Sequence, residues 1–348
     1  MMNSFKIGAR FVGQSHKPLV VAEIGINHGG SLDEAKKIAN TAILAGAEVV
    51  KHQTHIPEDE MSLEALQIKP GNANVSIYEV ISKSTLSEAD EFALKDFVES
   101  KGRFFISTPF SRKAVERIEK MDLPAIKIGS GECNNLPLIK LIVELGKPII
   151  LSTGMNSIET IRPSVELIRN ANLPFALLHC TNLYPTPQEL IRLQSIKELQ
   201  VAFPDAVLGL SDHSTSIYPC VAAVALGASI LERHFTDTRE RVGPDISCSM
   251  NPSELKELIQ GSEQVWLANK GGKRPIKQEG VTIAFAFSSV VADTNLQPGD
   301  VLNESNIWVR RPSGGDFSAN ELSSLFGKTV KHFIAKNTQL KRIDLNND

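Results

Sequence analysis

The chain has 348 residues, and its 37 Lys and Arg residues nearly balance its 40 Asp and Glu residues, which gives a formal net charge of −3. This near-balance argues against a protein that is held mainly by nucleic-acid phosphates or by an anionic membrane surface. Hydrophobic residues make up 42% of the chain and charged residues 22%, as in globular chains that bury a core and unlike disordered ones.

The N-terminal segment MMNSFKIGARFVGQSHKP has no apolar stretch followed by a small-residue cleavage site, so we do not expect secretion. The longest uncharged stretch near the middle, residues 217–231, contains Pro219. It falls short of the roughly 20 apolar residues that a membrane-spanning helix needs. The four cysteines form no CxxC pair, and we expect reduced, structural thiols in a cytoplasmic protein.

Eight short apolar runs follow one another between about residue 19 and residue 269. They are LVVAEIGIN, EVVKHQT, FFISTPF, AIKIGSGE, PIILSTG, FALLHCT, AVLGLSDH and SILERHF. Each is rich in the residues of strands buried on both faces, and most are separated by amphipathic segments such as SLDEAKKIANTAILAGA. Eight β/α units in this length predict a (β/α)8 TIM barrel of the α/β class. A doubly wound open sheet is the alternative, because periodicity does not establish closure.

Two segments interrupt this alternation. Residues 56–76 carry acidic residues, a Pro-Gly pair and little periodicity, which predicts a long loop of the kind that forms lids. Residues 270–280, KGGKRPIKQEG, are rich in Gly and Lys and predict a linker. Beyond it, residues 281–348 begin with the β-type run VTIAFAFSSVVA and continue with turn sequences such as QPGD. This combination of a β-type run and turn sequences predicts a small β-rich domain with little helix.

Polar side chains gather where the eight apolar runs end. They are Glu23 and Asn27, Lys51 and Gln53, Thr108, Lys127 to Glu132, Ser152 and Thr153, His179 to Asn182, Ser211 to His213, and His234. Exposed strand ends alone favour Gly, Asn, Asp and Ser, whereas this set includes lysines, histidines and glutamates. Because (β/α)8 enzymes place their sites at the carboxyl ends of the strands, we predict a functional site there.

Two lysines lie inside runs that are otherwise apolar enough to be buried, Lys51 in VVKHQT and Lys127 in AIKIGSGE. A buried lysine is costly unless an anion meets it, so the pair predicts a phosphate or carboxylate ligand. On an ideal strand Gln53 shares the face of Lys51, while His52 points to the other face. A Schiff-base nucleophile is the alternative use of such a lysine, and a lysine that extends to solvent at a strand end is the structural one.

Two histidines belong to the last two runs: His213 ends the seventh and His234 lies in the eighth. Adjacent barrel strands can bring both imidazoles to one point at the mouth of the barrel. Two histidines with open remaining positions suit a divalent metal that also takes water and substrate oxygens. No carboxylate stands at a fixed spacing from them. The alternative to a metal site is therefore that one histidine is a buried core residue and the other an unrelated surface residue.

Small hydroxyl residues and glycines follow several strands, in GSGE, STG and GLSDH. Their N–H and O–H groups can cradle a phosphate beside the two lysines. Strict alternation puts Lys127 and Ser130 on opposite faces of the strand. Both can line one site only if the strand ends or bulges near Gly129.

The motifs AEIGINHGGS, VVKHQTH, ISTPFS, KIGSGECNN, LSTGMNS, LHCTNLYPTP, GLSDHS and LERHFT closely resemble bacterial N-acetylneuraminate (sialic acid) synthases over nearly the whole chain. The segment WVRRPSGGDF resembles the antifreeze-like SAF domain of those enzymes. The resemblance implies a TIM-barrel catalytic domain over residues 1–269, a linker over 270–280 and an SAF domain over 281–348. It also implies a domain-swapped homodimer in which each small domain caps the active site of the partner's barrel.

The reaction implied by the resemblance is a transferase reaction. Phosphoenolpyruvate condenses with N-acetylmannosamine and water to give N-acetylneuraminate and phosphate. The resemblance places a divalent metal, Mn²⁺ first and Mg²⁺ or Co²⁺ as alternatives, on the positions of His213 and His234. It assigns phosphoenolpyruvate to Lys51, Lys127, Thr108, Ser130, Ser152, Asn182 and Ser211. It assigns the sugar, or proton and water handling, to Glu23, Gln53, Glu132, Tyr184 and Asp245.

Arg311 matches an arginine of the family that reaches the N-acetyl group across the dimer. Among the matched positions we expect Glu23, Glu132, His234, Lys51 and Lys127 to be catalytic. The chemistry agrees with this assignment. The C3 carbon of an enol phosphate is a weak nucleophile, so the aldehyde must be polarised, and a metal Lewis acid does so without a Schiff base. Positive charge then develops at C2, where we expect the carboxylate of Glu132 to stabilise it.

The nearest alternative is a sister synthase that makes legionaminic or pseudaminic acid from a diacetamido sugar with the same metal and phosphoenolpyruvate machinery. The segments VVKHQTHIPEDEMS and WVRRPSGGDFS favour the sialic acid type. A sugar with a 6-phosphate is a further possibility. A non-catalytic sugar- or ice-binding protein is the alternative from a different class, but a binder has no need of buried lysines and paired histidines.

Overall fold

Eight parallel strands close into a barrel in the first of two units, Met1–Lys270 and Gly271–Asp348. The computed structural model describes residues 4–71 and 73–346. The strands are β3 (Leu19–Gly25), β4 (Val49–Thr54), β5 (Phe104–Pro109), β6 (Ile126–Ile128), β7 (Ile149–Ser152), β8 (Phe175–Cys180), β9 (Val207–Ser211) and β10 (Ile230–His234). Strand β10 pairs with both β3 and β9, which closes the sheet. The predicted TIM barrel is confirmed and the open sheet is excluded.

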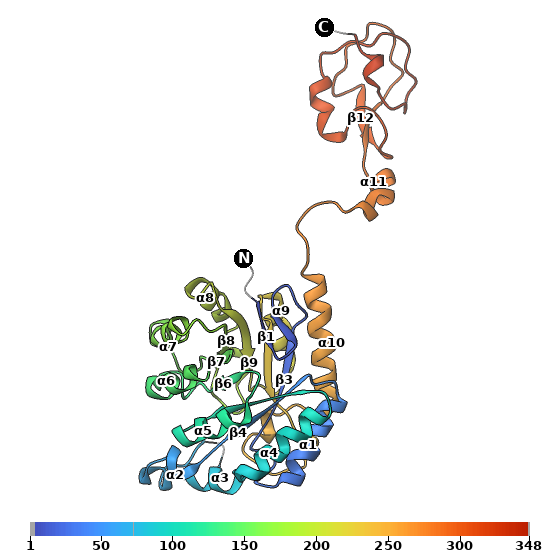
Figure 1. Ribbon diagram of the computed structural model, residues 1–348. Helices are drawn as coiled ribbons and strands as arrows, with labels where there is room; N and C mark the ends of the chain where they lie inside the picture. Colours follow the sequence, from blue (N-terminus) through green and yellow to red (C-terminus); the bar gives the residue numbers. More distant parts are fainter. Residues whose placement is uncertain (1–3, 72, 347–348) are drawn as a thin grey trace. The chain divides into compact units, whose positions relative to one another are not determined.

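Helices follow the strands and lie outside the barrel (Figure 1). They are α1 (Leu32–Leu44), α4 (Glu88–Ser100), α5 (Arg112–Met121), α6 (Leu136–Glu144), α7 (Ile158–Asn170), α8 (Ser195–Ala202), α9 (Tyr218–Ala225) and α10 (Pro252–Ala268). Local capping fixes where several of them begin. The Ser31 hydroxyl accepts a hydrogen bond from the Glu34 backbone at the start of α1, and Asn251 and Glu254 form a capping box at the start of α10.

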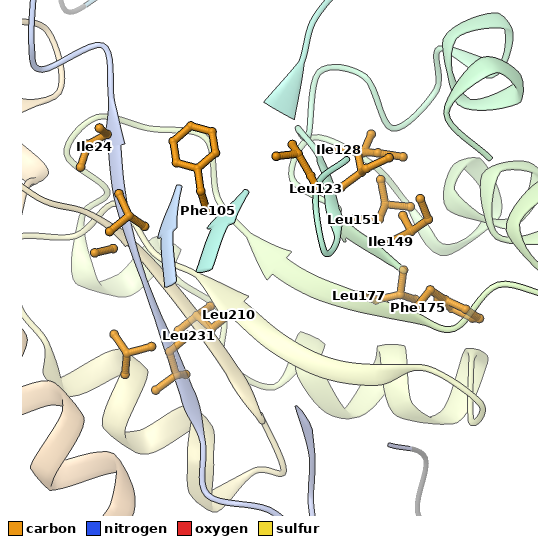
Figure 2. Close-up of a cluster of buried hydrophobic side chains, with 14 of the residues drawn as sticks. Ile24, Phe105, Leu123, Ile128, Ile149, Leu151, Phe175, Leu177, Leu210 and Leu231 are labelled. Carbon is orange, nitrogen blue, oxygen red and sulfur yellow. The ribbon is translucent and has the colours of Figure 1, made fainter. Parts of the chain in front are cut away.

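Two hydrophobic clusters hold the barrel unit together. The outer cluster joins strands to helices and includes Ile24, Phe105 and Leu151 (Figure 2). The inner cluster fills the barrel itself and includes residues such as Val49 and Ile106. A short antiparallel hairpin, which the sequence analysis did not predict, adds side chains to the inner cluster. It consists of β1 (Ser4–Ile7) and β2 (Arg10–Gly13).

Alternation along the barrel strands separates apolar interior positions from polar ones. Val49, on β4, belongs to the inner cluster, and Lys51 follows two residues later on the same face. Ile106 and Thr108 repeat the pattern on β5. The apolar side chains therefore occupy the barrel interior, and the polar ones reach its carboxyl end.

The segment after β4 differs from the predicted loop. It contains the short helix α2 (Pro57–Glu60) and the 3-10 turn η1 (Leu63–Leu66), and it leads into α3 (Ile77–Ser84). Because the Asp59 carboxylate accepts a hydrogen bond from the Lys113 backbone in α5 at 2.8 Å, helix α2 is tied to the barrel unit. Further 3-10 turns are η2 (Gln188–Leu190) and η3 (Ile246–Cys248).

The second unit has its own small core around Val290, Leu302 and Ile307. Its elements are η4 (Lys277–Glu279), α11 (Gly280–Ala286), β11 (Ser289–Ala292), β12 (Ile307–Arg310), η5 (Ala319–Leu325) and η6 (Arg342–Asp344). The prediction of a strand throughout VTIAFAFSSVVA is wrong for its first half. Only Ser289–Ala292 has a cross-strand partner, in β12, whereas the residues before it form a helix whose side chains are not buried.

Two expectations about the whole chain can be compared with the structure. Among the described residues, no helix is both long and apolar enough to cross a membrane. The four cysteines, Cys133, Cys180, Cys220 and Cys248, are free and buried, as expected for structural thiols.

Candidate active site

A pocket at the carboxyl ends of the barrel strands gathers most of the residues that the sequence singled out. The predicted residues that line it are Lys51, Gln53, Thr108, Lys127, Ser130, Ser152, Asn182, Tyr184, Ser211, His213 and His234. They come from seven of the eight barrel strands or from the segments directly after them. Their convergence follows from the closed sheet, because all parallel strands end at the same rim.

Lys51 lies between two carboxylates on the inner face of the barrel. Its ammonium pairs with Glu23 on β3 and lies 3.7 Å from Glu232 on β10. Burial alone would lower the pKa of Lys51, but the two carboxylates outweigh it and raise that pKa. Burial raises the pKa of Glu23 to about 7, although Lys51 opposes the shift. The lysine is therefore a buried cation, and Glu23 is able to exchange a proton near neutral pH.

Lys127 donates hydrogen bonds to the Ser152 hydroxyl at 2.7 Å and to the Ile128 carbonyl at 2.8 Å. Burial lowers the pKa of Lys127, and Glu232, 3.8 Å away, opposes that shift. Strand β6 ends at Ile128, so Gly129 lies beyond the alternation of the strand. This ending lets Lys127 and Ser130 line the same pocket.

The loop after β7 approaches the pocket closely at Gly154. Its backbone N–H donates to the Ser130 hydroxyl at 3.0 Å. A Cβ atom at this position would lie 1.8 Å from the Asn182 side-chain oxygen, so only glycine fits. Hydroxyl, amide and ammonium groups thus meet in a small volume that suits an anion.

The two histidines meet as predicted. The ring centroids of His213 and His234 lie 5.5 Å apart, and Tyr184 stacks on His213 at 4.1 Å. Burial, with smaller effects of neighbouring charges, lowers the pKa of His213 to about 4 and of His234 to about 3. Both rings are therefore neutral at pH 7, which is the form that ligates metals.

The donor set of these histidines fits a divalent metal that shares its coordination with substrate or water. His213 uses Nδ1 in a 3.0 Å contact with the Thr181 carbonyl, which leaves Nε2 as its free lone pair. Nδ1 of His234 is buried and has no hydrogen-bond partner, and it lies 3.6 Å from the Asp245 carboxylate. Within the described ranges, no cluster of three or more His, Cys, Asp or Glu residues could hold a metal ion by itself.

Glu23, Glu132 and Asp245 are not among the residues that line the pocket. Glu132 is half-buried in the loop after β6, where it accepts a hydrogen bond from Asn135 at 2.6 Å, and burial raises its pKa. Asp245 is buried beside His234, and burial raises its pKa to about 6. Arg311 belongs to the second unit. The roles assigned to the residues named in this paragraph remain predictions.

Sequence reasoning missed Glu232, which lies on the inner face of β10 and faces both lysines. Burial alone would raise the pKa of Glu232, but Lys127 and Lys51 outweigh it and lower that pKa. The signal was present, because Glu232 precedes His234 by two residues on one strand and must share its face. Phe110 also lines the pocket and was not singled out, and Cys180, which was expected to be a structural thiol, lines it as well.

Asn27 fixes the segment that carries Asp245. Its amide donates to the Phe235 carbonyl and to the Ser249 hydroxyl, both at 2.9 Å. The Ser249 hydroxyl donates in turn to the Asp245 carbonyl at 2.7 Å. Sequence reasoning noted Asn27 only as a polar residue near a strand end, and its partners lie more than 200 residues away.

Comparison with known proteins places this site in a family. Residues 38–274 match the NeuB family and residues 287–345 the SAF domain. An N,N'-diacetyllegionaminic acid synthase of Campylobacter jejuni is 35% identical over 90% of this chain and 95% of its own length. The N-acetylneuraminate-9-phosphate synthase of Homo sapiens is 33% identical over 92% of this chain and 90% of its own.

Among solved structures, an N-acetylneuraminic acid (sialic acid) synthetase of Leptospira borgpetersenii matches with a TM-score of 0.75 at 27% identity. The match covers 81% of this chain and 96% of that one. The family match extends over more than half of the chain and includes β4 to β10. The chain therefore belongs to the NeuB family of phosphoenolpyruvate-utilising sugar-acid synthases, with an SAF domain in its second unit.

Proposed function

We propose that this enzyme condenses phosphoenolpyruvate with N-acetylmannosamine and water to form N-acetylneuraminate and phosphate. The observation that carries the proposal is the position of two buried lysines, Lys51 and Lys127, in one pocket with the imidazoles of His213 and His234. An anionic enol phosphate and a sugar carbonyl need these two kinds of group at close range.

The lysine side of the pocket is the proposed phosphoenolpyruvate site. Lys51 and Lys127 offset the charge of the phosphate and carboxylate. Thr108, Ser130, Ser152, Asn182 and Ser211 supply short polar side chains around them. The barrel interior behind them is apolar, so these interactions act in a medium of low dielectric and favour the charge that develops as phosphate leaves.

The histidine side is the proposed site for the sugar carbonyl. His213 and His234 would hold a divalent cation, Mn²⁺ in first place and Mg²⁺ or Co²⁺ otherwise. A cation bound there would supply Lewis-acid polarisation of the aldehyde oxygen. Tyr184, stacked on His213, restricts the rotation of that ring. Asp245, 3.6 Å from His234, adds negative charge beside the two imidazoles.

The bond changes follow from this arrangement. C3 of phosphoenolpyruvate forms a bond to the aldehyde carbon, the π electrons of the carbonyl move to the aldehyde oxygen, which takes up a proton, and C2 becomes electron-deficient. We assign the stabilisation of C2 to the carboxylate of Glu132. Water then adds at C2 and loses a proton, and the hydroxyl so formed loses its own proton as the bond from C2 to the phosphate oxygen breaks, which leaves a C2 ketone and inorganic phosphate. Glu23, whose pKa is raised to about 7, is suited to exchanging that proton at neutral pH.

The second unit supplies the remaining part of the proposal. We propose a domain-swapped homodimer in which the SAF domain of one protomer caps the barrel of the other and Arg311 contacts the N-acetyl group of the sugar. Such a cap would exclude water from the reacting centre.

The identity of the sugar is the part that needs an experiment. The sequence segments around Gln53 and Arg311 favour N-acetylmannosamine, whereas the Campylobacter jejuni relative is named for a diacetamido product. The purified protein should be incubated with phosphoenolpyruvate, Mn²⁺ and one sugar at a time: N-acetylmannosamine, its 6-phosphate or a 2,4-diacetamido sugar. We expect the highest rate of phosphate release with N-acetylmannosamine. A clear preference for the diacetamido sugar would assign the chain to legionaminic or pseudaminic acid synthesis.

A further inference from the structure

His55 lies directly after β4 and next to the pocket, and the proposed mechanism gives it no role. It is buried, and its ring stacks on the pocket residue Phe110 with centroids 4.3 Å apart. Ring atom Nε2 lies 3.0 Å from the Gln53 side-chain oxygen. Ring atom Nδ1 lies 2.7 Å from the Glu60 carboxylate.

These contacts form part of a continuous chain that ends at the buried lysine. The Gln53 amide nitrogen donates to the Glu23 carboxylate at 3.0 Å, and the other oxygen of Glu23 pairs with Lys51. Because the amide nitrogen of Gln53 is directed to Glu23, its oxygen is left to accept from His55. The histidine therefore determines which end of the amide faces Glu23.

Both ring nitrogens of His55 face acceptors, the amide oxygen of Gln53 and the carboxylate of Glu60. Both ring nitrogens are therefore engaged by side chains of the protein, Nε2 by Gln53 and Nδ1 by Glu60. Neither nitrogen is left to take a proton from a substrate, so the geometry gives His55 no direct acid–base role. Its action on the site must pass through Gln53.

Glu60 links this chain to the segment after β4. It is the last residue of helix α2, and its neighbour Asp59 is held by the backbone of α5. The carboxylate that orients His55 is thus itself anchored. Stacking on Phe110 restrains the ring in the perpendicular direction.

We propose that His55 is a positioning residue for the sugar: its Nε2–H fixes the amide of Gln53, which lines the pocket, and through that amide the orientation of the Glu23 carboxylate beside it. This inference rests on the proposed function and on the assignment of Gln53 and Glu23 to the sugar or to proton and water handling. Without His55, Lys127 keeps its hydrogen bonds to Ser152 and to the Ile128 carbonyl, and Lys51 keeps its contact with Glu232 at 3.7 Å. Loss of the Nε2 donor should therefore affect the sugar and leave phosphoenolpyruvate nearly untouched.

Two substitutions of His55 distinguish the roles of its two ring nitrogens. His55→Asn retains an amide near Nδ1, in reach of Glu60, and removes the donor to Gln53. His55→Gln places an amide near Nε2, where it can still donate to Gln53. We expect H55N to raise the KM for the sugar about tenfold, the effect of one lost hydrogen bond to a site residue, with the KM for phosphoenolpyruvate unchanged. We expect H55Q to stay within about threefold of the wild type for both substrates.

A double-mutant cycle tests whether the effect passes through Gln53. Gln53→Ala alone should raise the KM for the sugar, and adding H55N to Q53A should raise it no further. His16→Asn, which alters a histidine that stacks on Phe11 in the region of the β1–β2 hairpin, should behave as the wild type. If H55N does not fold, Glu60→Gln leaves the ring in place and should shift the KM for the sugar alone, in the same direction.

The outcomes distinguish this inference from the proposed function. If the wild type is active but H55N and H55Q are equally impaired, or both substrates are affected alike, or the H55N and Q53A effects add, the positioning role is wrong. If the wild type releases no phosphate with any acetamido sugar, the proposed function fails first and the inference fails with it.

Discussion

The carboxylate of Glu232 lies 3.8 Å from the ammonium of Lys127, across the interior of the barrel. Glu232 is also 3.7 Å from Lys51, so one carboxylate serves two buried cations. Its Oε1 accepts a hydrogen bond from Ser211 at 3.3 Å. A carboxylate in this position compensates the lysines before an anionic substrate arrives.

Glu232→Gln should therefore destabilise the protein and make it depend on anionic ligands. Removing one partner of a buried ion pair leaves the other uncompensated, at a cost of about 3 kcal/mol. Thermal unfolding should detect this loss, and phosphoenolpyruvate should raise the melting temperature of E232Q more than that of the wild type. Glu48→Gln, which breaks a partly exposed pair with Arg10, is the control and should cost less than about 1 kcal/mol. An E232Q protein as stable as the wild type would contradict the compensating role.

His234→Ala should nearly abolish phosphate release while the protein still folds. Activity should be lost because the proposed metal site would retain only one of its two histidines, His213. Chelation of the wild type with EDTA should abolish turnover, and Mn²⁺ should restore it. His332→Ala, at a largely exposed position in the second unit, is the control for loss of an imidazole. Turnover that survives chelation would favour a Schiff-base aldolase, which borohydride trapping with substrate would detect, whereas no turnover with or without Mn²⁺ would favour a binder.

Much of the barrel and of its pocket could be predicted because both follow from strand alternation. Strands buried on both faces produced apolar runs, and Lys51 and Lys127 were visible as charged residues within them. Glu232 was overlooked because three polar residues, Glu232, Arg233 and His234, follow one another within its run SILERHF. Alternation places Arg233 on the opposite face from Glu232 and His234, and in the structure Arg233 pairs with Asp212.

Other features depend on contacts that sequence spacing does not encode. The contact of His55 with Glu60 requires α2 to fold back over the end of β4, and a Pro-Gly-containing acidic segment gives no sign of it. The hairpin of β1 and β2 has four-residue strands that pair only with each other, too short for a clear periodic pattern. The apolar residues of segment 281–292 are compatible with either a helix or a strand. The part of the segment that forms a strand is determined by its pairing with β12.

The buried pair of Glu91 and Arg117 should make stability depend on pH. The two side chains lie 2.8 Å apart, and Thr54 donates to the same carboxylate. Burial raises the pKa of Glu91 to about 7, although Arg117 and Thr54 oppose the shift. The folded protein therefore holds a proton on Glu91 that the unfolded chain loses near its ordinary value of 4.5, so this group's contribution to stability falls as pH rises from about 5 to about 7.

Glu91→Gln removes this titration. Urea unfolding of the wild type and of E91Q between about pH 5 and pH 8 should give a stability difference that shifts in favour of E91Q as pH rises. Glu99→Gln, on the exposed face of the same helix α4, is the control for losing a glutamate there. A stability difference that shifts in favour of the wild type with rising pH would show that the ionised pair, and not the neutral carboxyl, is the preferred buried form.

Arg311→Ala should weaken the use of the sugar far more than that of phosphoenolpyruvate, because the proposed cross-subunit contact is to the N-acetyl group. Steady-state kinetics should give a higher KM for N-acetylmannosamine and a nearly unchanged KM for phosphoenolpyruvate. Arg310→Ala is the matched control, since Arg310 pairs with Asp293 inside its own domain while Arg311 is exposed. R310A should affect the stability of the second unit and leave both KM values unchanged. An equal loss for both substrates in R311A would argue against a capping role, because a residue that reaches only the sugar cannot alter the binding of the enol phosphate held by the lysines.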